Sequence, residues 1–300
     1  MEYHNYNYFK NSIINNYNYD IDELDKYFNF SESISKELYF VIKIIEKLNS
    51  ESILPIKITS SSDSLIVLIF SNFVIKLFQF ESIFDKEISI IENCKNNQNI
   101  VNSLGYFSTN NGKINKNNIV NISEKLNLDN RNIFISITEK LELLTELNNN
   151  KINLLIDINN IHILLKLFLE IGSALEELHN NGIVHGDCRL DNIGYKDNKF
   201  VLFDFNASNF ENKNYLCDII TLIKSVKFYI NNIDDYIIKD FLNFIKLSQN
   251  GDILINNILT FYREYFGYKS DNEIINIIKS IDISKFLLHP WKFKTPDSPI

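Results

Sequence analysis

Two stretches of the sequence decide the fold: Ile183-Val184-His185-Gly186-Asp187-Cys188-Arg189-Leu190-Asp191-Asn192 and Leu202-Phe203-Asp204-Phe205-Asn206. Asp187 and Asn192 lie five positions apart, and Asp204 follows after an interval that suits a short hairpin. An acid, an amide and a second acid at these spacings suit the holding of a metal-bound phosphate beside a nucleophile, because Mg²⁺ prefers oxygen ligands. These three side chains are therefore the first candidates for a functional site.

The order H-x-D-x-x-x-x-N, followed by D-F-x, resembles the catalytic and metal-binding loops of the protein-kinase-like superfamily. The resemblance implies that Asp187 accepts or orients the hydroxyl proton of the phosphate acceptor, and that Asn192 and Asp204 hold Mg²⁺. Arg189 stands where many kinases carry a lysine that contacts the transferred phosphoryl group, and its guanidinium could supply the same charge. Asp218 resembles the aspartate that braces the backbone of this loop. The alternative for Asp187 and Asn192 is an Asx-rich loop that caps a helix.

The ATP-binding residues are also implied by this resemblance. Phe73-Val74-Ile75-Lys76 is similar to the strand that ends in a phosphate-anchoring lysine, although a lysine there is often only an edge-strand charge. Glu87 is the expected ion-pair partner of Lys76, and Glu92 is the rival. Ile137 to Leu141 resembles the hinge, in which backbone groups of Glu139 and Leu141 would bind adenine. The phosphate loop falls on three serines: Ser60, Ser61 and Ser62.

The composition fits a folded chain with an acidic balance. The 300 residues are 45% hydrophobic and 23% charged, with a net charge of −8, so a broad nucleic-acid surface is not expected. Three cysteines lie far apart with no C-x-x-C, which suggests neither a disulfide framework nor a zinc site. We read no signal peptide and no apolar run near the roughly 20 residues of a membrane span. The expected location is intracellular, in the cytoplasm; the oligomeric state is left open.

The predicted fold is α+β: a two-lobed protein-kinase-like arrangement. Residues 1–28 form an Asn/Tyr-rich extension. Residues 29–140 form the N-lobe, with a small antiparallel β-sheet and one main helix, and residues 141–300 form a mainly helical C-lobe. The expected N-lobe elements are a helix at 35–48, strands at 56–58, 65–70, 73–78, 104–108 and 133–138, a helix at 81–94 and a polar insertion at 109–131. The expected C-lobe helices, in a region where the periodicity turns helical after Leu141, are 161–178, 217–231, 234–248, 252–266 and 272–287.

Three departures from the kinase pattern limit the comparison. No glycine precedes Gly105, so the phosphate loop has no glycines and weaker ATP binding is expected. Gly186 replaces the arginine of H-R-D, which argues against control by a phosphorylated activation loop, and Asn206 replaces the glycine of D-F-G. Only 13 residues separate Asp204 from Asp218, which is short for a peptide-docking segment. A closing His289-Pro290-Trp291 nevertheless resembles eukaryotic protein kinases.

Three functions follow as hypotheses. The first is a divergent serine/threonine protein kinase that uses ATP and Mg²⁺ to phosphorylate a protein hydroxyl. The second is a small-molecule kinase of the aminoglycoside or choline-kinase-like type, which the short segment after Asp204 favours. The third is a pseudokinase that serves as a binding module, which the missing glycines favour.

Overall fold

The computed structural model describes residues 57–59, 64–69, 73–78, 80–108, 134–148, 151–154, 156–211, 213–230 and 235–287. Contacts divide the chain into two compact units. The first holds the described residues up to Glu81 together with Leu104–Lys140, and the second holds Ser82–Ser103 and the residues from Leu141 onward. The predicted extension at 1–28, the helix at 35–48, the three serines at 60–62 and the insertion at 109–131 lie outside the described residues.

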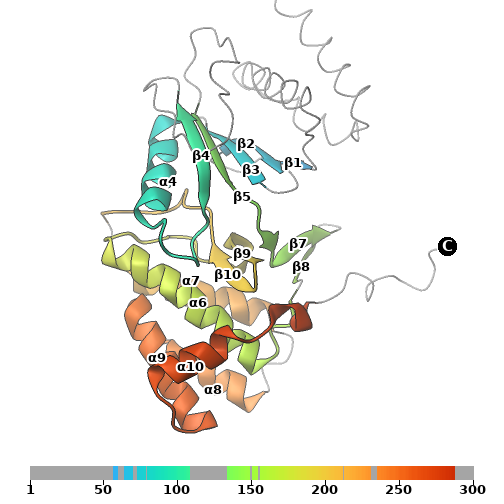
Figure 1. Cartoon of the computed structure of the whole chain (residues 1–300), viewed down its shortest axis with the longest axis vertical. Helices are drawn as coiled ribbons and strands as arrows, with labels where there is room; N and C mark the ends of the chain where they lie inside the picture. Colours follow the sequence, from blue (N-terminus) through green and yellow to red (C-terminus); the bar gives the residue numbers. More distant parts are fainter. Residues whose placement is uncertain are drawn as a thin grey trace, which may run out of the picture. The chain divides into compact units, whose positions relative to one another are not determined.

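The first unit is built on a five-stranded sheet. Its strands are β1 (Lys57–Thr59), β2 (Ser64–Ile69), β3 (Phe73–Phe78), β4 (Ser103–Ser108) and β5 (Phe134–Glu139). Their order is β1-β2-β3-β5-β4, with β3 in the middle (Figure 1). In antiparallel register Lys76 of β3 faces Val67 of β2 and Ser136 of β5. Ile75 and Leu77 are buried on either side of the half-buried Lys76. The alternating apolar pattern therefore produces the strand that the sequence predicts.

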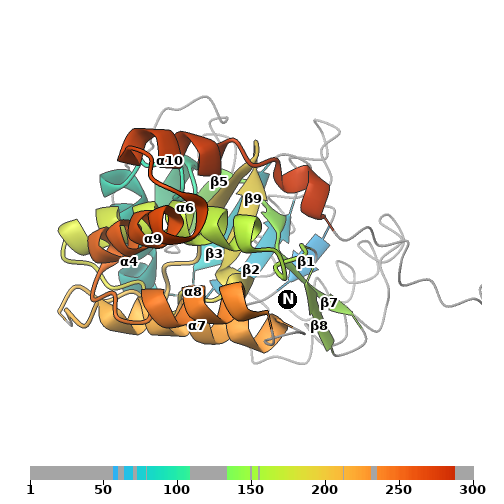
Figure 2. The ribbon, with the colours of Figure 1, turned by 90° about the horizontal axis from the view of Figure 1, so that it is seen from below.

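The second unit is mainly helical. Its helices are α4 (Glu81–Asn93), α6 (Ile161–Asn180), α7 (Leu216–Tyr229), α8 (Tyr236–Ile245), α9 (Gly251–Phe266) and α10 (Asp271–Lys279). Apolar residues surround most of α6, as expected for a helix in the middle of a core. Figure 2 shows α9 and α10 beside it. A β-carbon on Gly251 would lie 2.2 Å from the Glu176 nitrogen, so a glycine is needed where α9 meets α6. None of the described helices is both long and apolar enough to cross a membrane.

A buried ion pair on α6 ties this helix to its neighbours. Lys166 and Glu170, one turn apart, are paired at 3.0 Å with almost no exposed surface. The Lys166 ammonium also donates to the Lys279 carbonyl at the end of α10, at 2.6 Å. The Glu170 carboxylate accepts the Phe200 N–H at 2.8 Å, and burial raises the pKa of Glu170 against the opposing effect of Lys166. Both charges keep strong partners, which a buried pair requires.

Helix α4 and the residues after it pack in the second unit, although the sequence-based division placed them with the first. The reason is their apolar side chains, which join the second unit's core: Ile90, Ile91, Cys94, Ile100 and Val101. The backbone then runs beside strand β10 (Lys199–Leu202), where Leu202 donates to the Asn99 carbonyl at 2.8 Å and Val101 donates to the Leu202 carbonyl at 3.0 Å.

Two sequence expectations for the second unit are wrong. The region after Leu141 does not turn helical at once: β6 (Glu142–Leu143) pairs with β9 (Ile193–Lys196), and β7 (Thr145–Asn148) pairs with β8 (Lys151–Leu154). The helix expected at 272–287 ends at Lys279. Asp282 then caps a separate 3₁₀ turn by accepting the Ser284 N–H, so the chain restarts instead of continuing α10. The apolar residues of both regions fit helical spacing, but local turns decide their structure.

Candidate active site

The candidate site rests on a buried carboxylate at the start of α7. Asp218 is fully buried and accepts the backbone N–H groups of His185 and Gly186, each at 2.8 Å. The sequence comparison expected this brace. Asp218 is also 3.1 Å from Nε2 of His179, whose Nδ1 accepts the Gly251 N–H at 3.0 Å. A histidine with its proton on Nε2 satisfies both contacts, so α6, α7 and α9 meet at one polar centre under the loop.

His185 connects the loop to the D-F-N segment. Its Nδ1 accepts the Asp187 N–H at 3.2 Å, and its Nε2 lies 3.2 Å from the Phe203 carbonyl. The neutral imidazole with its proton on Nε2 makes both bonds. Burial lowers the pKa of His185, and the nearby carboxylates, led by Asp218, only partly oppose that shift. The ring is therefore held neutral, and it fixes the backbone on both sides of the candidate base.

Asp187, Arg189 and Asn192 come together as the sequence predicted. The Arg189 guanidinium donates two hydrogen bonds to the Asp187 carboxylate, from Nε to Oδ1 at 2.6 Å and from Nη2 to Oδ2 at 2.9 Å. The Asn192 amide nitrogen donates at 2.9 Å to both the Asp187 carbonyl and its Oδ2. The Asp187 and Arg189 side chains are 32% and 51% exposed, so both can be reached by a reactant. Their pairing raises the pKa of Arg189 further.

A hairpin connects the loop of Asp187 and Asn192 to the segment that begins with Asp204. Asn192 ends a short 3₁₀ turn, β9 and β10 follow, and the Phe203 N–H then donates back to the Asn192 carbonyl at 3.0 Å. The hairpin therefore returns the chain to Asn192 just before Asp204. Asp204 has a φ of 64°, a left-handed conformation that a non-glycine residue keeps only when its surroundings enforce it.

The segment after Asp204 lies directly against Gly186. Gly186 has a φ of 82°, and a β-carbon on it would be 2.4 Å from the Ala207 carbonyl oxygen. Val184 and Asn209 exchange two backbone hydrogen bonds of 2.9 Å, and the Ser208 hydroxyl donates to the His185 carbonyl at 3.1 Å. The glycine in H-G-D thus makes room for the segment, where an arginine would collide with it.

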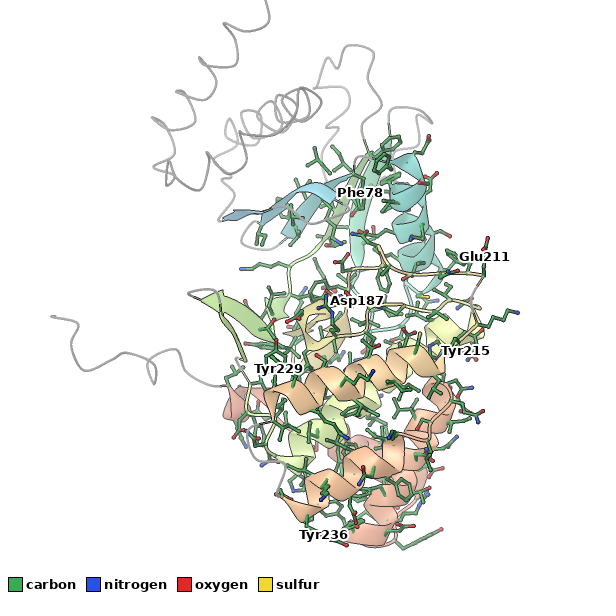
Figure 3. All side chains as sticks on the ribbon, turned by 180° about the vertical axis from the view of Figure 1, so that it is seen from behind. Phe78, Asp187, Glu211, Tyr215, Tyr229 and Tyr236 are labelled. Atoms are coloured by element: carbon green, nitrogen blue, oxygen red, sulfur yellow. The ribbon has the colours of Figure 1, made fainter. Side chains whose placement is uncertain are left out.

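A brace around Asp191 was missed by the sequence analysis. Its Oδ1 accepts the Thr145 hydroxyl at 2.9 Å and the Tyr229 hydroxyl at 3.3 Å. Leu190 donates its N–H to the Ser225 hydroxyl at 3.0 Å. Burial and the Asp191 charge raise the pKa of Tyr229 to about 12. Figure 3 shows Asp187 beside α7, at whose C-terminal end Tyr229 lies. Strand β7 and α7 therefore both hold the loop, a tertiary arrangement that leaves no local sequence signal.

The donor set fits Mg²⁺. The Asn192 nitrogen is used by Asp187, which directs the amide oxygen to other partners, and Asp204 supplies a carboxylate. Among the described residues the buried side-chain oxygen of Asn206 has no hydrogen-bond partner, and a cation or water would satisfy it. Within the described ranges no three His, Cys, Asp or Glu side chains form a metal cluster, so the candidate set depends on amide oxygens.

The predicted ATP-binding residues divide between the two units. Lys76 on β3 and Glu139 at the end of β5 belong to the first. Glu87, 1% exposed on α4, and the buried Leu141 belong to the second. The pairing of Lys76 with Glu87 joins the units and stays a prediction. Ser60, Ser61 and Ser62 lie outside the described residues.

The neutral state of His185 predicts a pH dependence of stability. Its pKa in the folded chain is below the ordinary 6.5, so the unfolded chain takes up the proton first as the pH falls. The free energy of unfolding should drop below pH 6.5 by at most about 1.4 kcal/mol per pH unit from this proton. Urea unfolding at pH 7.5 and 5.5 measures it. His185→Asn, which keeps an acceptor, should flatten the slope, whereas the exposed-residue control His162→Gln should not; equal slopes in all three chains contradict the assignment.

The contact at Gly186 predicts a position-specific cost. Gly186→Ala should lower the free energy of unfolding by more than Gly182→Ala does. Both glycines have positive φ, for which strain is on the order of 1–3 kcal/mol, but a β-carbon on Gly182 meets nothing within 4 Å. The difference between the two variants in urea unfolding therefore isolates the collision with Ala207. Equal losses of unfolding free energy in the two variants would show that the segment after Asp204 moves away from the added β-carbon at no cost.

Comparisons with known proteins found one partial sequence match and structural similarity to a viral kinase. No protein-family model matches the chain. Serine/threonine-protein kinase kin-29 of Caenorhabditis briggsae is 46% identical over 52 residues, which are 17% of this chain and only 6% of that protein. The solved structure of the Cydia pomonella granulovirus kinase PK-1 is similar over 76% of this chain and 99% of that chain, at 16% identity and a TM-score of 0.42. The small β-sheet of the first unit, the mainly helical second unit and the loop braced by Asp218 agree with the two-lobed arrangement that the sequence predicts.

Proposed function

We propose that the protein is an ATP- and Mg²⁺-dependent phosphotransferase, and most specifically a divergent serine/threonine protein kinase that transfers the γ-phosphate of ATP to a protein hydroxyl. The observation that carries the proposal is the arrangement of Asp187, Arg189 and Asn192 on one braced loop. A reachable carboxylate, a cation bound to it and an amide oriented by it are the groups that phosphoryl transfer requires.

Asp187 would accept the acceptor's hydroxyl proton. Its Oδ2 is held by Asn192 and Arg189, so a proton acceptor is fixed in direction before a reactant arrives. Arg189 can leave Asp187 for the transferred phosphoryl group, because the neighbouring Asp191 lies 3.8 Å from its guanidinium and offers a second anchor. Asn192 and Asp204 would hold Mg²⁺, which neutralises charge on the phosphates. Each proposed role therefore falls on a residue whose place the loop fixes.

The residues proposed to hold the nucleotide are those that the sequence resemblance implies. Lys76, paired with Glu87, would contact the α- and β-phosphates, and backbone groups of Glu139 and Leu141 would bind adenine. Ser60, Ser61 and Ser62 would cover the phosphates through their backbone N–H groups, with restricted approach because each carries a β-carbon. The central position of Lys76 in β3, between two neighbouring strands, supports this proposal over that of an edge-strand charge.

A small molecule is the second candidate acceptor. The segment from Phe205 to Asn209 is bonded to the loop at Val184 and His185 rather than spread as a docking platform. A short segment of this kind suits a small alcohol as well as a protein chain. The resemblance of the final residues to eukaryotic protein kinases keeps the protein acceptor first.

Phosphate transfer from ATP labelled in the γ-phosphate tests the function. The chain should label generic protein substrates in the presence of Mg²⁺, and Asp187→Asn should lower the rate by about 10²–10⁴-fold, the usual contribution of a positioned general base. Asp197→Asn, which makes the same change in the exposed β9–β10 turn, should leave the rate near that of the unmodified chain.

Three outcomes separate the hypotheses. Transfer to amino-alcohol or sugar acceptors but not to proteins would establish the small-molecule kinase. Equal transfer by the unmodified chain and Asp187→Asn would remove Asp187 from the mechanism. If no acceptor is labelled and ATP with Mg²⁺ does not raise the melting temperature, the chain is a pseudokinase binding module, because a ligand that binds only the native state must stabilise it.

A further inference from the structure

Helix α4 is bonded to the D-F-N segment through one lysine. The Lys86 ammonium donates a hydrogen bond to the backbone carbonyl of Asn206, two residues after Asp204. Both residues belong to the second unit, and both are half-buried. A charged donor on a partly buried carbonyl makes a strong hydrogen bond. This bond links parts of the chain that are 120 positions apart.

The bond acts on the backbone after Asp204, in addition to the bonds that Ser208 and Asn209 make with the loop. Before Asp204, Phe203 is fixed at its N–H by the Asn192 carbonyl and at its carbonyl by His185. After Asp204, the chain turns at Asn206, where Lys86 binds it. The left-handed conformation of Asp204 persists only while its surroundings hold it. Lys86 adds a contact from α4 to the contacts that the loop makes with the segment.

The orientation of α4 about its own axis determines the direction in which Lys86 points. Phe84, Ile88 and Ile91 are buried along one side of α4, which fixes the helix about its axis. Consecutive residues of a helix point about 100° apart, so the rotation that buries Glu87 also sets the direction of Lys86. The helix that carries the candidate partner of Lys76 therefore also holds the D-F-N segment.

The segment offers no accessible hydroxyl of serine or threonine for phosphorylation. Ser208 is the single serine or threonine between Asp204 and Asp218. It is 4% exposed, and its hydroxyl is bonded to the His185 carbonyl.

We propose that Lys86 is a positioning residue for Asp204: by holding the Asn206 backbone, it keeps the D-F-N segment in its metal-binding conformation without phosphorylation. This inference rests on the proposed function, in which Asp204 holds Mg²⁺. Lys86 on α4 fixes the segment, and Gly186 leaves the space that the segment occupies.

Hydrogen exchange and metal affinity test the inference together. In Lys86→Met the amides of Ser208 and Asn209 should exchange faster by about tenfold or more, because a hydrogen bond to a charged group is lost. The Mg²⁺ concentration that gives half of the ATP-dependent rise in melting temperature should increase by about tenfold. Lys86→Arg should restore both, and Lys95→Met, at an exposed lysine just after the same helix, should change neither.

Each outcome either supports or overturns the proposed role of Lys86. Unchanged exchange in Lys86→Met overturns the inference, and so does faster exchange with an unaltered Mg²⁺ requirement. If ATP does not raise the melting temperature of the unmodified chain in a Mg²⁺-dependent way, the proposed function fails. The hydrogen-exchange measurement alone then shows whether Lys86 holds the segment. Faster exchange in Lys86→Met that is limited to the segment supports this holding role, and unchanged exchange contradicts it.

Discussion

The buried carboxylate of Asp218 is the constraint on which the site depends. It accepts the backbone N–H groups of His185 and Gly186 and contacts His179. Because a buried charge is stable only when its hydrogen bonds are satisfied, the loop backbone and the carboxylate hold each other in place. The direction of Asp187 follows from this anchor, since His185 in turn accepts the Asp187 N–H. A surface loop thereby gains the precision that positioning a reactant requires.

The rest of the unit extends that precision to Asn192 and Asp204, the proposed metal ligands. Strand β10 is held at Phe200, whose N–H donates to Glu170 and whose carbonyl accepts from the Asn99 side chain, each at 2.8 Å. Asp204 follows this strand directly, and Lys86 fixes the chain beyond it. Gly186 allows the segment to approach the loop.

The parts of the site that are local can be predicted from the sequence. A short turn connects Asp187 to Asn192, and a hairpin returns the chain to Asn192 just before Asp204, while the roles of the three residues stay predictions. The sequence could not predict the contacts of His179 or the Lys166–Glu170 pair, since these polar residues of α6 gain their partners only through packing. The Asp191 brace depends on Thr145 and Tyr229, which are distant in the chain. The β7–β8 hairpin was missed because its apolar residues also fit a helix.

The most direct measurement concerns Asp218→Asn, in which the charge is lost but an oxygen acceptor remains. The rate of γ-phosphate transfer should be measured beside the hydrogen-exchange rates of the His185 and Gly186 amides, with far-UV circular dichroism to establish that the helices persist. The account predicts that exchange at both amides accelerates and that transfer falls by about 10²-fold or more, as for a misplaced catalytic group. Faster exchange with undiminished transfer would contradict the claim that this anchor builds the active loop.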